Sequence, residues 1–321
     1  MDTGTSYRLF VGIDIAGETF TASWATERTT PRARPITLSQ TPEGFAALQT
    51  QLQATTVAPP ETLVVMEATG SYWIALAVTL HAAGYHISVV NPAHAHNYAK
   101  SVSRRSKTDD LDAVLLTQFA AERQPTCWTP PPAVYHELRQ RLVARAALLA
   151  MRQQARNHRH ALLQWPVVVA SVLTQLDDTI TDLDGRIRTL EDELTQVLAD
   201  GDWAESARLL QTIPGIGMLS AAWLLVLTIN FSLCRSAAAA GSYAGLVPLD
   251  YRSGTSVRGR ATIGHGGNAR LRHVAYLATL SAARHNPTIR VFYQRLRDAG
   301  KPMKVARCAA ARKLLGAPGP W

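Results

Sequence analysis

The sequence predicts a mixed α/β domain followed by a mainly helical remainder. Over roughly the first 125 residues, short apolar runs that end in acidic or turn residues alternate with helical patterns, as expected when strands and helices share one sheet. Farther along, leucine and isoleucine recur at heptad spacing, which predicts a coiled coil. The chain has 321 residues, 47% of them hydrophobic, and is therefore long enough for more than one domain with its own core.

The α/β part is expected to contain five strands and four helices. Its first three strands follow one another closely and predict an antiparallel meander. The later strands alternate with helices, as in a parallel extension of the sheet. The expected strands are residues 9–15, 20–26, 34–38, 62–66 and 86–90, and the expected helices are residues 41–53, 72–83, 93–101 and 109–122.

A coiled-coil connector is expected next, after a proline-rich linker at 130–132. It begins with a long basic helix at 134–163. Apolar residues then alternate at spacings of three and four from Leu173 to Val197, an unbroken heptad pattern. The pattern does not name its partner, which is either the rest of this chain, the 134–163 helix included, or another copy. The expected domains are residues 1–128, 129–200 and 201–321.

The C-terminal part is expected to be mainly helical. Residues 213–217 (IPGIG) form a turn that leads into a helix and resembles the hairpin of helix–hairpin–helix DNA-binding modules. Its two glycines allow backbone amides to approach a phosphate. A loop rich in glycine, arginine and serine follows at 251–268, and residues 269–283 and 287–314 are expected to be helical.

Positive charge is concentrated in two segments. The net charge is +9, but residues 251–321 carry 14 basic side chains against one acid, and residues 131–165 carry six against one. Most of these cations are arginine, which suits bidentate contact with phosphate, so a nucleic acid is the expected partner. For the 134–163 helix we expect RNA. The residues predicted to contact nucleic acid are Arg139, Arg145, Arg152, Arg156, Arg159, Gly215, Gly217, Arg252, Arg258, Arg260, Asn268, Arg270 and Arg272.

Several classes of protein are excluded or disfavoured. Cys127, Cys234 and Cys308 form neither a zinc-binding motif nor a disulfide framework, which fits a reducing cytosol. The N-terminus has no apolar signal-peptide core, and no apolar run approaches the ~18 residues of a membrane span. The sequence therefore predicts a cytoplasmic protein.

Four acids occupy positions that suit metal chemistry. Asp14 and Glu67 end two expected strands, and Asp109 and Asp112 share one face at the start of a helix, with Asp110 turned about 100° away. Carboxylates that converge in this way bind Mg²⁺ or Mn²⁺, which suits phosphodiester chemistry. Each acid alone also has a structural interpretation, such as a favourable charge at a helix N-terminus.

Two serines lie in the arginine-rich loop. Ser253 and Ser256 flank a Gly-Thr pair and are placed to meet a phosphate. A serine hydroxyl is a poor nucleophile unless a base, a metal or nearby cations assist it. Spacing does not select one serine over the other.

These motifs together resemble a known family, the DEDD transposases of bacterial insertion sequence family 110, which are bridge-RNA-guided serine recombinases. The resemblance covers about residues 7–315. It is carried, in order, by GIDIA (12–16), MEATGSY (66–72), VVNPAHA (89–95), KTDDLDA (107–113), IPGIG (213–217), YAGLVP (243–248) and SGTSVRG (253–259). The chain departs from the family pattern before Asn268, where the family often has a Ser-Lys pair.

The resemblance implies a RuvC-like (ribonuclease-H-like) N-terminal domain, a coiled-coil connector and a C-terminal transposase domain. It implies that Asp14, Glu67, Asp109 and Asp112 bind Mg²⁺ or Mn²⁺, and that Ser253 is the nucleophile, forming a phosphoserine link to DNA. A structured RNA from the element's flank would pair with target and donor DNA. The two halves of the active site would come from different subunits of a tetramer, a dimer of dimers. Such a protein would be associated with the nucleoid.

Two other functions fit the residues. One is a protein-only, metal-dependent nuclease or Holliday-junction resolvase, in which water attacks and Ser253 only holds phosphate. The other is a catalytically silent nucleic-acid-binding protein whose acids are structural. A covalent protein–DNA link distinguishes the recombinase from both.

Overall fold

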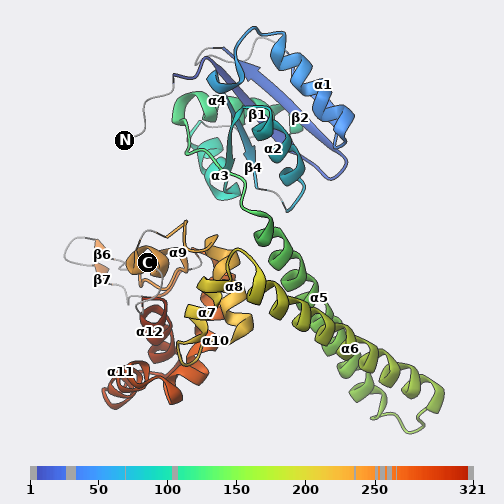
Figure 1. Ribbon diagram of the computed structural model, residues 1–321, viewed down its shortest axis with the longest axis vertical. Helices are drawn as coiled ribbons and strands as arrows, with labels where there is room; N and C mark the ends of the chain where they lie inside the picture. The colour runs from blue at the N-terminus through green and yellow to red at the C-terminus, as the bar shows by residue number, and fades with distance from the viewer. Residues whose placement is uncertain are drawn as a thin grey trace. The chain divides into compact units, whose positions relative to one another are not determined.

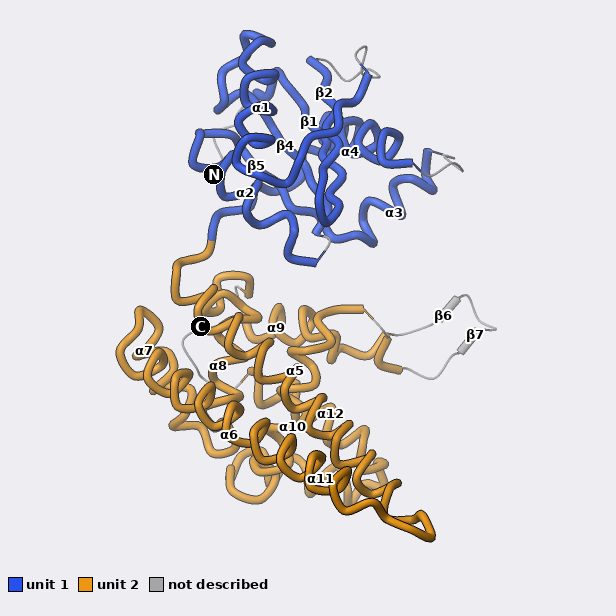
Figure 2. Tube along the Cα trace, turned by 90° about the vertical axis from the view of Figure 1, so that its right-hand side faces the viewer, with its two compact units in different colours: residues 1–130 blue, residues 131–321 orange. Residues whose placement is uncertain are grey.

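The computed structural model divides the chain into two compact units, residues 1–130 and 131–321 (Figure 2). Backbone and side chains are described for residues 6–26, 34–68, 70–102, 108–234, 236–249, 262–264 and 266–316, and the backbone alone for 252–253 and 257–258. The second unit contains both the expected connector and the expected C-terminal domain.

Unit 1 is built on a five-stranded mixed sheet with strand order β3-β2-β1-β4-β5 (Figure 1). Antiparallel pairing joins β1 to β2 and β2 to β3, whereas β4 and β5 extend the sheet in parallel. The predicted meander with a parallel extension is thereby confirmed. The strands are β1 (Leu9–Ile15), β2 (Thr19–Ala25), β3 (Ile36–Ser39), β4 (Thr62–Glu67) and β5 (His86–Val90).

Helices cover both faces of this sheet. Side chains of β1 alternate between two apolar clusters, since Val11 packs with Leu48 and Leu76 on one face while Phe10 packs with Leu116 on the other. A side-chain oxygen caps the N-terminus of three of the helices, at Thr41, Asn91 and Thr108. The elements are α1 (Pro42–Gln53), the short 3₁₀ helix η1 (Pro59–Glu61), α2 (Trp73–Ala82), α3 (Pro92–Ser101) and α4 (Asp109–Arg123).

Unit 2 begins with a long helical hairpin, α5 (Ala133–Leu162) and α6 (Ala170–Asp200), in which the two helices pack along each other (Figure 1). The heptad pattern of α6 supplies most of its buried side chains, namely Leu183, Ile187 and Leu194. The partner of that pattern within this chain is therefore the preceding helix.

The base of the hairpin shares one apolar core with the C-terminal helices. Leu138 of α5 and Leu194 of α6 belong to the same cluster as Leu225, Leu271 and Leu314.

Among the described residues, no helix is long and apolar enough to cross a membrane. The remaining elements are α7 (Ala204–Gln211), α8 (Met218–Thr228), α9 (Ala237–Tyr243), β6 (Arg252–Ser253), β7 (Val257–Arg258), α10 (Ala269–His285), α11 (Pro287–Asp298) and α12 (Met303–Leu315).

The single helical stretch expected at 287–314 is wrong in one respect, because the chain forms two helices there. Between α11 and α12, Gly300 adopts a left-handed φ of +75°, and Pro302 precedes the first turn of α12. Proline lacks an N–H and disfavours helical geometry in the residue before it, so the helix cannot continue through this point.

Candidate active site

Asp14 and Glu67 lie side by side at the carboxyl ends of two parallel strands. The register of β1 against β4 pairs Ile13 with Met66, so the next residues of the two strands are Asp14 and Glu67. Both residues are half-buried. Adjacent parallel strands thus bring two carboxylates to one edge of the sheet, as the sequence predicted.

Helix α4 is held against β1 by a close backbone contact at Gly12. A Cβ atom at this position would lie 2.3 Å from the carbonyl oxygen of Ala113 and 2.2 Å from the backbone nitrogen of Thr117. Only glycine allows this approach. Thr117 is buried, and its hydroxyl lies 3.1 Å from the Gly12 nitrogen and 2.9 Å from the carbonyl oxygen of Ser23.

The same helix carries the other two acids in its first turn. The Thr108 hydroxyl accepts a hydrogen bond from the Leu111 backbone N–H at 3.3 Å and fixes where α4 begins. Asp109 and Asp112 then follow at i and i+3. Docking of α4 onto β1 therefore decides where these two carboxylates lie.

The electrostatics of Asp14 show that the other three acids lie close enough to act on its carboxylate. The pKa of Asp14 is raised from 3.8 to about 6, first by burial and then by the nearby carboxylates of Asp112, Asp109 and Glu67, in that order. Asp110 does not contribute. The structure therefore gathers the same four residues that the sequence singled out, and it separates Asp109 from its neighbour Asp110.

A divalent cation fits this cluster chemically. Four carboxylates that repel one another, one of them with a raised pKa, are relieved when a cation enters, and hard cations prefer such oxygens. As they stand, no three acidic, histidine or cysteine side chains within the described ranges are grouped closely enough to hold a metal ion. Metal binding would therefore require these side chains to move.

Ser253 lies in a two-stranded antiparallel ribbon of unit 2. It belongs to β6 and pairs with Val257 of β7, while Arg252 pairs with Arg258. Of these residues only the backbone is described. Two further residues of this segment that were singled out, Ser256 and Arg260, lie outside the described residues.

Two turns that flank this segment in the sequence are held together by Arg272. Its guanidinium donates to the carbonyl oxygens of Ala244 at 3.1 Å, Gly266 at 2.9 Å and Gly245 at 3.5 Å. The side chain of Asn268 caps α10 by accepting from the Leu271 N–H. Arg272 and Asn268 thus have internal structural roles, and their contact with nucleic acid stays a prediction.

The IPGIG turn uses its two glycines differently. Gly215 has a left-handed φ of +108°, and a Cβ atom there would lie 2.5 Å from the Cβ atom of Ala282 on α10. Gly217 precedes α8 in extended conformation with nothing within 4 Å of its added Cβ atom. Packing explains Gly215, and Gly217 alone has open space for an approaching phosphate.

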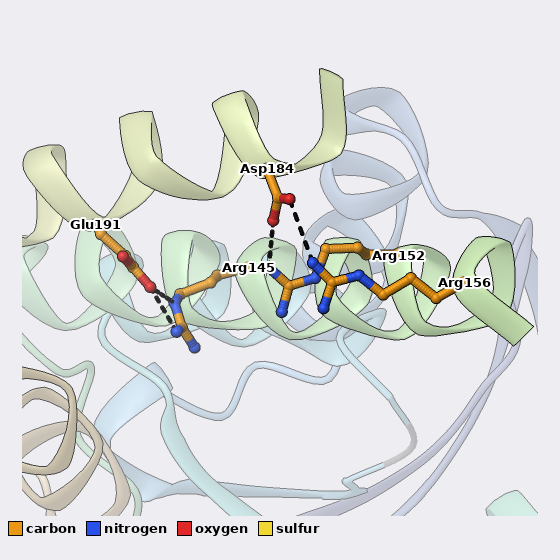
Figure 3. A network of polar contacts seen from close by, with 5 residues as sticks. All are labelled: Arg145, Arg152, Arg156, Asp184 and Glu191. Carbon is orange, nitrogen blue, oxygen red and sulfur yellow. Dashed lines mark hydrogen bonds and ion pairs between the residues drawn. The ribbon is translucent and has the colours of Figure 1, made fainter. Parts of the chain in front are cut away.

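Most of the arginines that were singled out on α5 pair with acids of α6. Figure 3 shows Arg145 pointing to Glu191, and Arg152 and Arg156 converging on Asp184. Arg159 pairs in the same way with Asp177.

The two helices therefore offset each other's charge, since residues 131–200 contain eight arginines and nine acids. Sequence reasoning counted the two segments separately and missed this pairing. Two other arginines that were predicted to contact nucleic acid place their guanidinium groups over aromatic rings. Arg139 lies over Tyr135 and Arg270 over Trp223, at 5.7 and 4.8 Å from the ring centroids. An RNA contact from α5 stays a prediction and requires its arginines to exchange partners.

Sequence reasoning also missed Gly12 and Thr117 as positioning residues. One signal was present, because a glycine inside an otherwise apolar strand often marks a close approach of another backbone. The residues around Gly12 could not show which element approaches it, since Thr117 lies 105 residues farther along the chain.

Comparison with known proteins covers both units. Residues 11–165 match the family model of IS110-type DEDD transposases, described as a transposase, and residues 207–294 match the model described as "Transposase IS116/IS110/IS902 family". The first match includes Asp14, Glu67, Asp109 and Asp112, and the second includes Ser253.

Similar curated proteins include two inverting proteins and a transposase. The "Pilin gene-inverting protein" of Moraxella lacunata is 32% identical over 314 residues, covering 96% of this chain and 94% of the relative. Its namesake from Moraxella bovis is 31% identical with the same coverage. The transposase for insertion sequence element IS1328 of Yersinia enterocolitica is 26% identical over 235 residues, 65% of this chain and 67% of the relative.

Proposed function

The chain belongs to the IS110 family of transposases, and on this premise we propose that it cuts and rejoins DNA through a serine nucleophile assisted by a divalent metal. The observation that carries the proposal is the convergence of three carboxylates on Asp14. The proposal includes a RuvC-like fold for unit 1, which the mixed sheet and its covering helices support.

Asp14, Glu67, Asp109 and Asp112 would hold the metal, Mg²⁺ or Mn²⁺. Bound there, it would supply stabilisation of charge on the phosphodiester oxygens. The chain's own contribution is positional, because the β1–β4 register sets the first pair of carboxylates and the Gly12 contact sets the second.

Ser253 would carry the covalent step. Its Oγ atom forms a bond to phosphorus, the bond between phosphorus and one deoxyribose oxygen breaks, and the proton that the serine hydroxyl loses ends on that oxygen. Because one phosphodiester replaces another, the protein–DNA link is about as reactive as the bond that was cut, and a free DNA hydroxyl can attack it to rejoin the strand. Nearby arginines of the same segment, Arg252 and Arg258 in the paired strands, support the proposal because cations stabilise the phosphate charge.

The partners in the proposal are target and donor DNA, a structured guide RNA and further copies of this chain. Base pairing with the RNA would choose the sequence, while protein contacts would hold the backbone. A tetramer would supply the carboxylates and the serine of each active site from different subunits. We place the protein at the nucleoid, where its DNA is.

Site-specific inversion is a second candidate outcome of the same chemistry. Two relatives that match nearly the whole chain carry the name "Pilin gene-inverting protein". Cutting and rejoining two sites in inverted orientation on one molecule inverts the segment between them, and the same steps between molecules give insertion. Plasmids with sites in both arrangements separate the two outcomes.

The test is covalent capture of the protein on DNA. We expect denatured reactions to contain protein-linked DNA strands that protease digestion releases, in wild type and in Ser256→Ala. Ser253→Ala should lose the link and strand exchange by more than about a hundredfold, as expected when a nucleophile is removed.

Three results would contradict the proposal. DNA cleavage without any covalent link would mean that water attacks, as in a nuclease or resolvase. Loss of the link in Ser256→Ala with retention in Ser253→Ala would move the nucleophile. Asp14→Asn that leaves cleavage unchanged would show that the carboxylates are structural.

A further inference from the structure

A groove in unit 2 combines an apolar floor with a cationic rim. It lies between α9, α11 and α12 and encloses about 1060 Å³. Its apolar side chains include Leu246, Ile263, Phe292 and Val305. This volume suits one or two nucleotides, and it is far too small for a DNA duplex.

The rim is formed by Lys301, Lys304, Arg312 and Lys313, and none of the described residues that line the groove is acidic. Ion pairs found in the described part of the chain involve none of these four. In contrast, most of the arginines singled out on α5 form ion pairs with acids of α6. The four cations of the rim are therefore available to bind an anionic ligand, because no ion pair within the described residues engages them.

A lysine and an aromatic ring lie side by side in the groove. The Nζ atom of Lys313 lies 5.0 Å from the centroid of the Phe292 ring, inside the range of a cation–π contact. Aromatic faces beside lysine or arginine are the surfaces on which unpaired bases stack while their phosphates are held.

The groove also adjoins the segment that carries Ser253. Pro248 and Thr262, which both line it, lie at the two ends of the segment that contains β6 and β7. The backbone N–H of Leu249 donates to the carbonyl oxygen of Thr262 at 2.9 Å and closes that segment at its base.

We propose that this groove binds an unpaired nucleotide of single-stranded DNA. The base would lie on the apolar floor and the phosphate against the lysines of the rim. A duplex presents only its phosphates to such a surface, because its bases are stacked and paired. An unpaired nucleotide can place its base on the apolar floor and its phosphate against the cationic rim at the same time. That the nucleotide arises when strands are exchanged rests on the proposed function, but its binding does not.

Cys308 lines the groove and serves as a reporter. The experiment uses the full chain with Ser253→Ala, so that DNA is not cut, and follows alkylation of each cysteine by N-ethylmaleimide with peptide mass spectrometry. We expect oligo(dT) of about ten nucleotides, a length that covers one single-strand site, to slow alkylation of Cys308 about tenfold. A duplex of equal length should slow it little. Cys127, exposed in the other unit, is the internal reference.

Variants separate the rim from general positive charge. Lys304→Gln combined with Lys313→Gln should weaken oligo(dT) binding about tenfold and lower its salt slope by about 1.4, because each phosphate contact of a single strand contributes about 0.7. Arg290→Gln is the matched control, an exposed cation of α11 outside the groove. Ala238→Phe fills the groove without changing charge and should abolish protection of Cys308.

Three outcomes would overturn the inference. Equal protection by a duplex would mean a general phosphate surface, and protection by RNA alone would mean a different nucleic acid. The third is a Cys308 that is protected without nucleic acid and becomes reactive when the chain is cut after Gly316, which would make the chain's own end the occupant. A wild-type chain that binds oligo(dT) in the groove but neither cuts nor rejoins DNA would instead count against the proposed function alone.

Discussion

The backbone N–H of Gly12, in the middle of β1, donates a hydrogen bond to the Oγ1 atom of Thr117 on α4 at 3.1 Å. The Thr117 hydroxyl also lies within hydrogen-bond distance of a carbonyl oxygen of β2 and one of its own helix. One buried side chain thus ties two strands to the helix that carries Asp109 and Asp112.

Thr117→Val should destabilise unit 1 by about 1–3 kcal/mol, because it removes the buried hydroxyl that accepts from the N–H of Gly12. Strand exchange should fall with it, since α4 is no longer held in register with β1. Urea unfolding measures the first effect. Thr50→Val is the control, because the Thr50 hydroxyl is exposed and bonds only within its own helix, so a change below about 0.5 kcal/mol is expected.

Asp14→Asn should stabilise the folded chain above pH 6 while abolishing activity. The pKa of Asp14 is raised to about 6 in the folded state, so the folded chain holds this proton more tightly than the unfolded chain does. Stability that the proton provides is present below about pH 4 and is lost as pH rises to about 6. The difference between variant and wild type should therefore grow across this window.

After discounting for solvent screening of the half-exposed carboxyl, that difference should reach about 1 kcal/mol. Thermal unfolding between pH 4 and 8 measures it. Asp110→Asn removes the same charge from a residue that does not act on Asp14, and its difference from wild type should stay flat. Added Mg²⁺ should stabilise wild type and not Asp14→Asn. A flat difference for Asp14→Asn would contradict the clustering of the four carboxylates.

Asp184→Asn should increase the affinity of the chain for RNA. The substitution releases Arg152 and Arg156, which pair with this carboxylate across the hairpin. Affinity at about 50 mM salt should rise severalfold, with a steeper salt dependence, because two more cations are available to phosphate. Stability should fall only slightly, since the pairs are partly exposed.

Filter binding over a salt series measures the affinity. Asp182→Asn is the control, because its partner Arg186 lies on the same helix and away from the α5 arginines. An unchanged affinity and slope in Asp184→Asn would argue that RNA does not contact this face of α5.

Arg272→Gln should destabilise unit 2 by about 2 kcal/mol, because the carbonyl oxygens of two turns lose a charged donor. The salt slope of DNA binding should not change if the clamp is the only role of Arg272. A slope that falls by about 0.9 would instead identify a phosphate contact on duplex DNA. Arg270→Gln, whose side chain rests on Trp223, provides the comparison within the same helix.

Local patterns were sufficient for most of the secondary structure and for the four acids, but not for contacts between distant segments. Alternation and heptad spacing are properties of neighbouring residues, and each strand-end acid could be identified from its own strand. Pairing of Arg152 with Asp184 depends on how two helices meet, and the clash that Gly215 avoids depends on Ala282 of a distant helix. Charge counted by segment therefore overstated how much of α5 is free for phosphate.

Gly215 and Gly217 allow the two roles of the IPGIG turn to be separated. Gly215→Ala should destabilise unit 2 by about 2–3 kcal/mol, because it places a Cβ atom against Ala282 and forces a left-handed φ on alanine. Gly217→Ala meets no neighbouring atom and has an extended backbone, so its stability should match that of wild type within about 0.5 kcal/mol.

The added methyl group of Gly217→Ala nevertheless stands before the first turn of α8, where no side chain caps the N–H groups. If these groups hold a phosphate, DNA affinity should fall about tenfold in this well-folded variant, since the methyl keeps the backbone from close approach. Urea unfolding and DNA titration on the same two proteins measure both quantities. Unchanged affinity in Gly217→Ala would leave the turn with a packing role only, carried by Gly215 against α10.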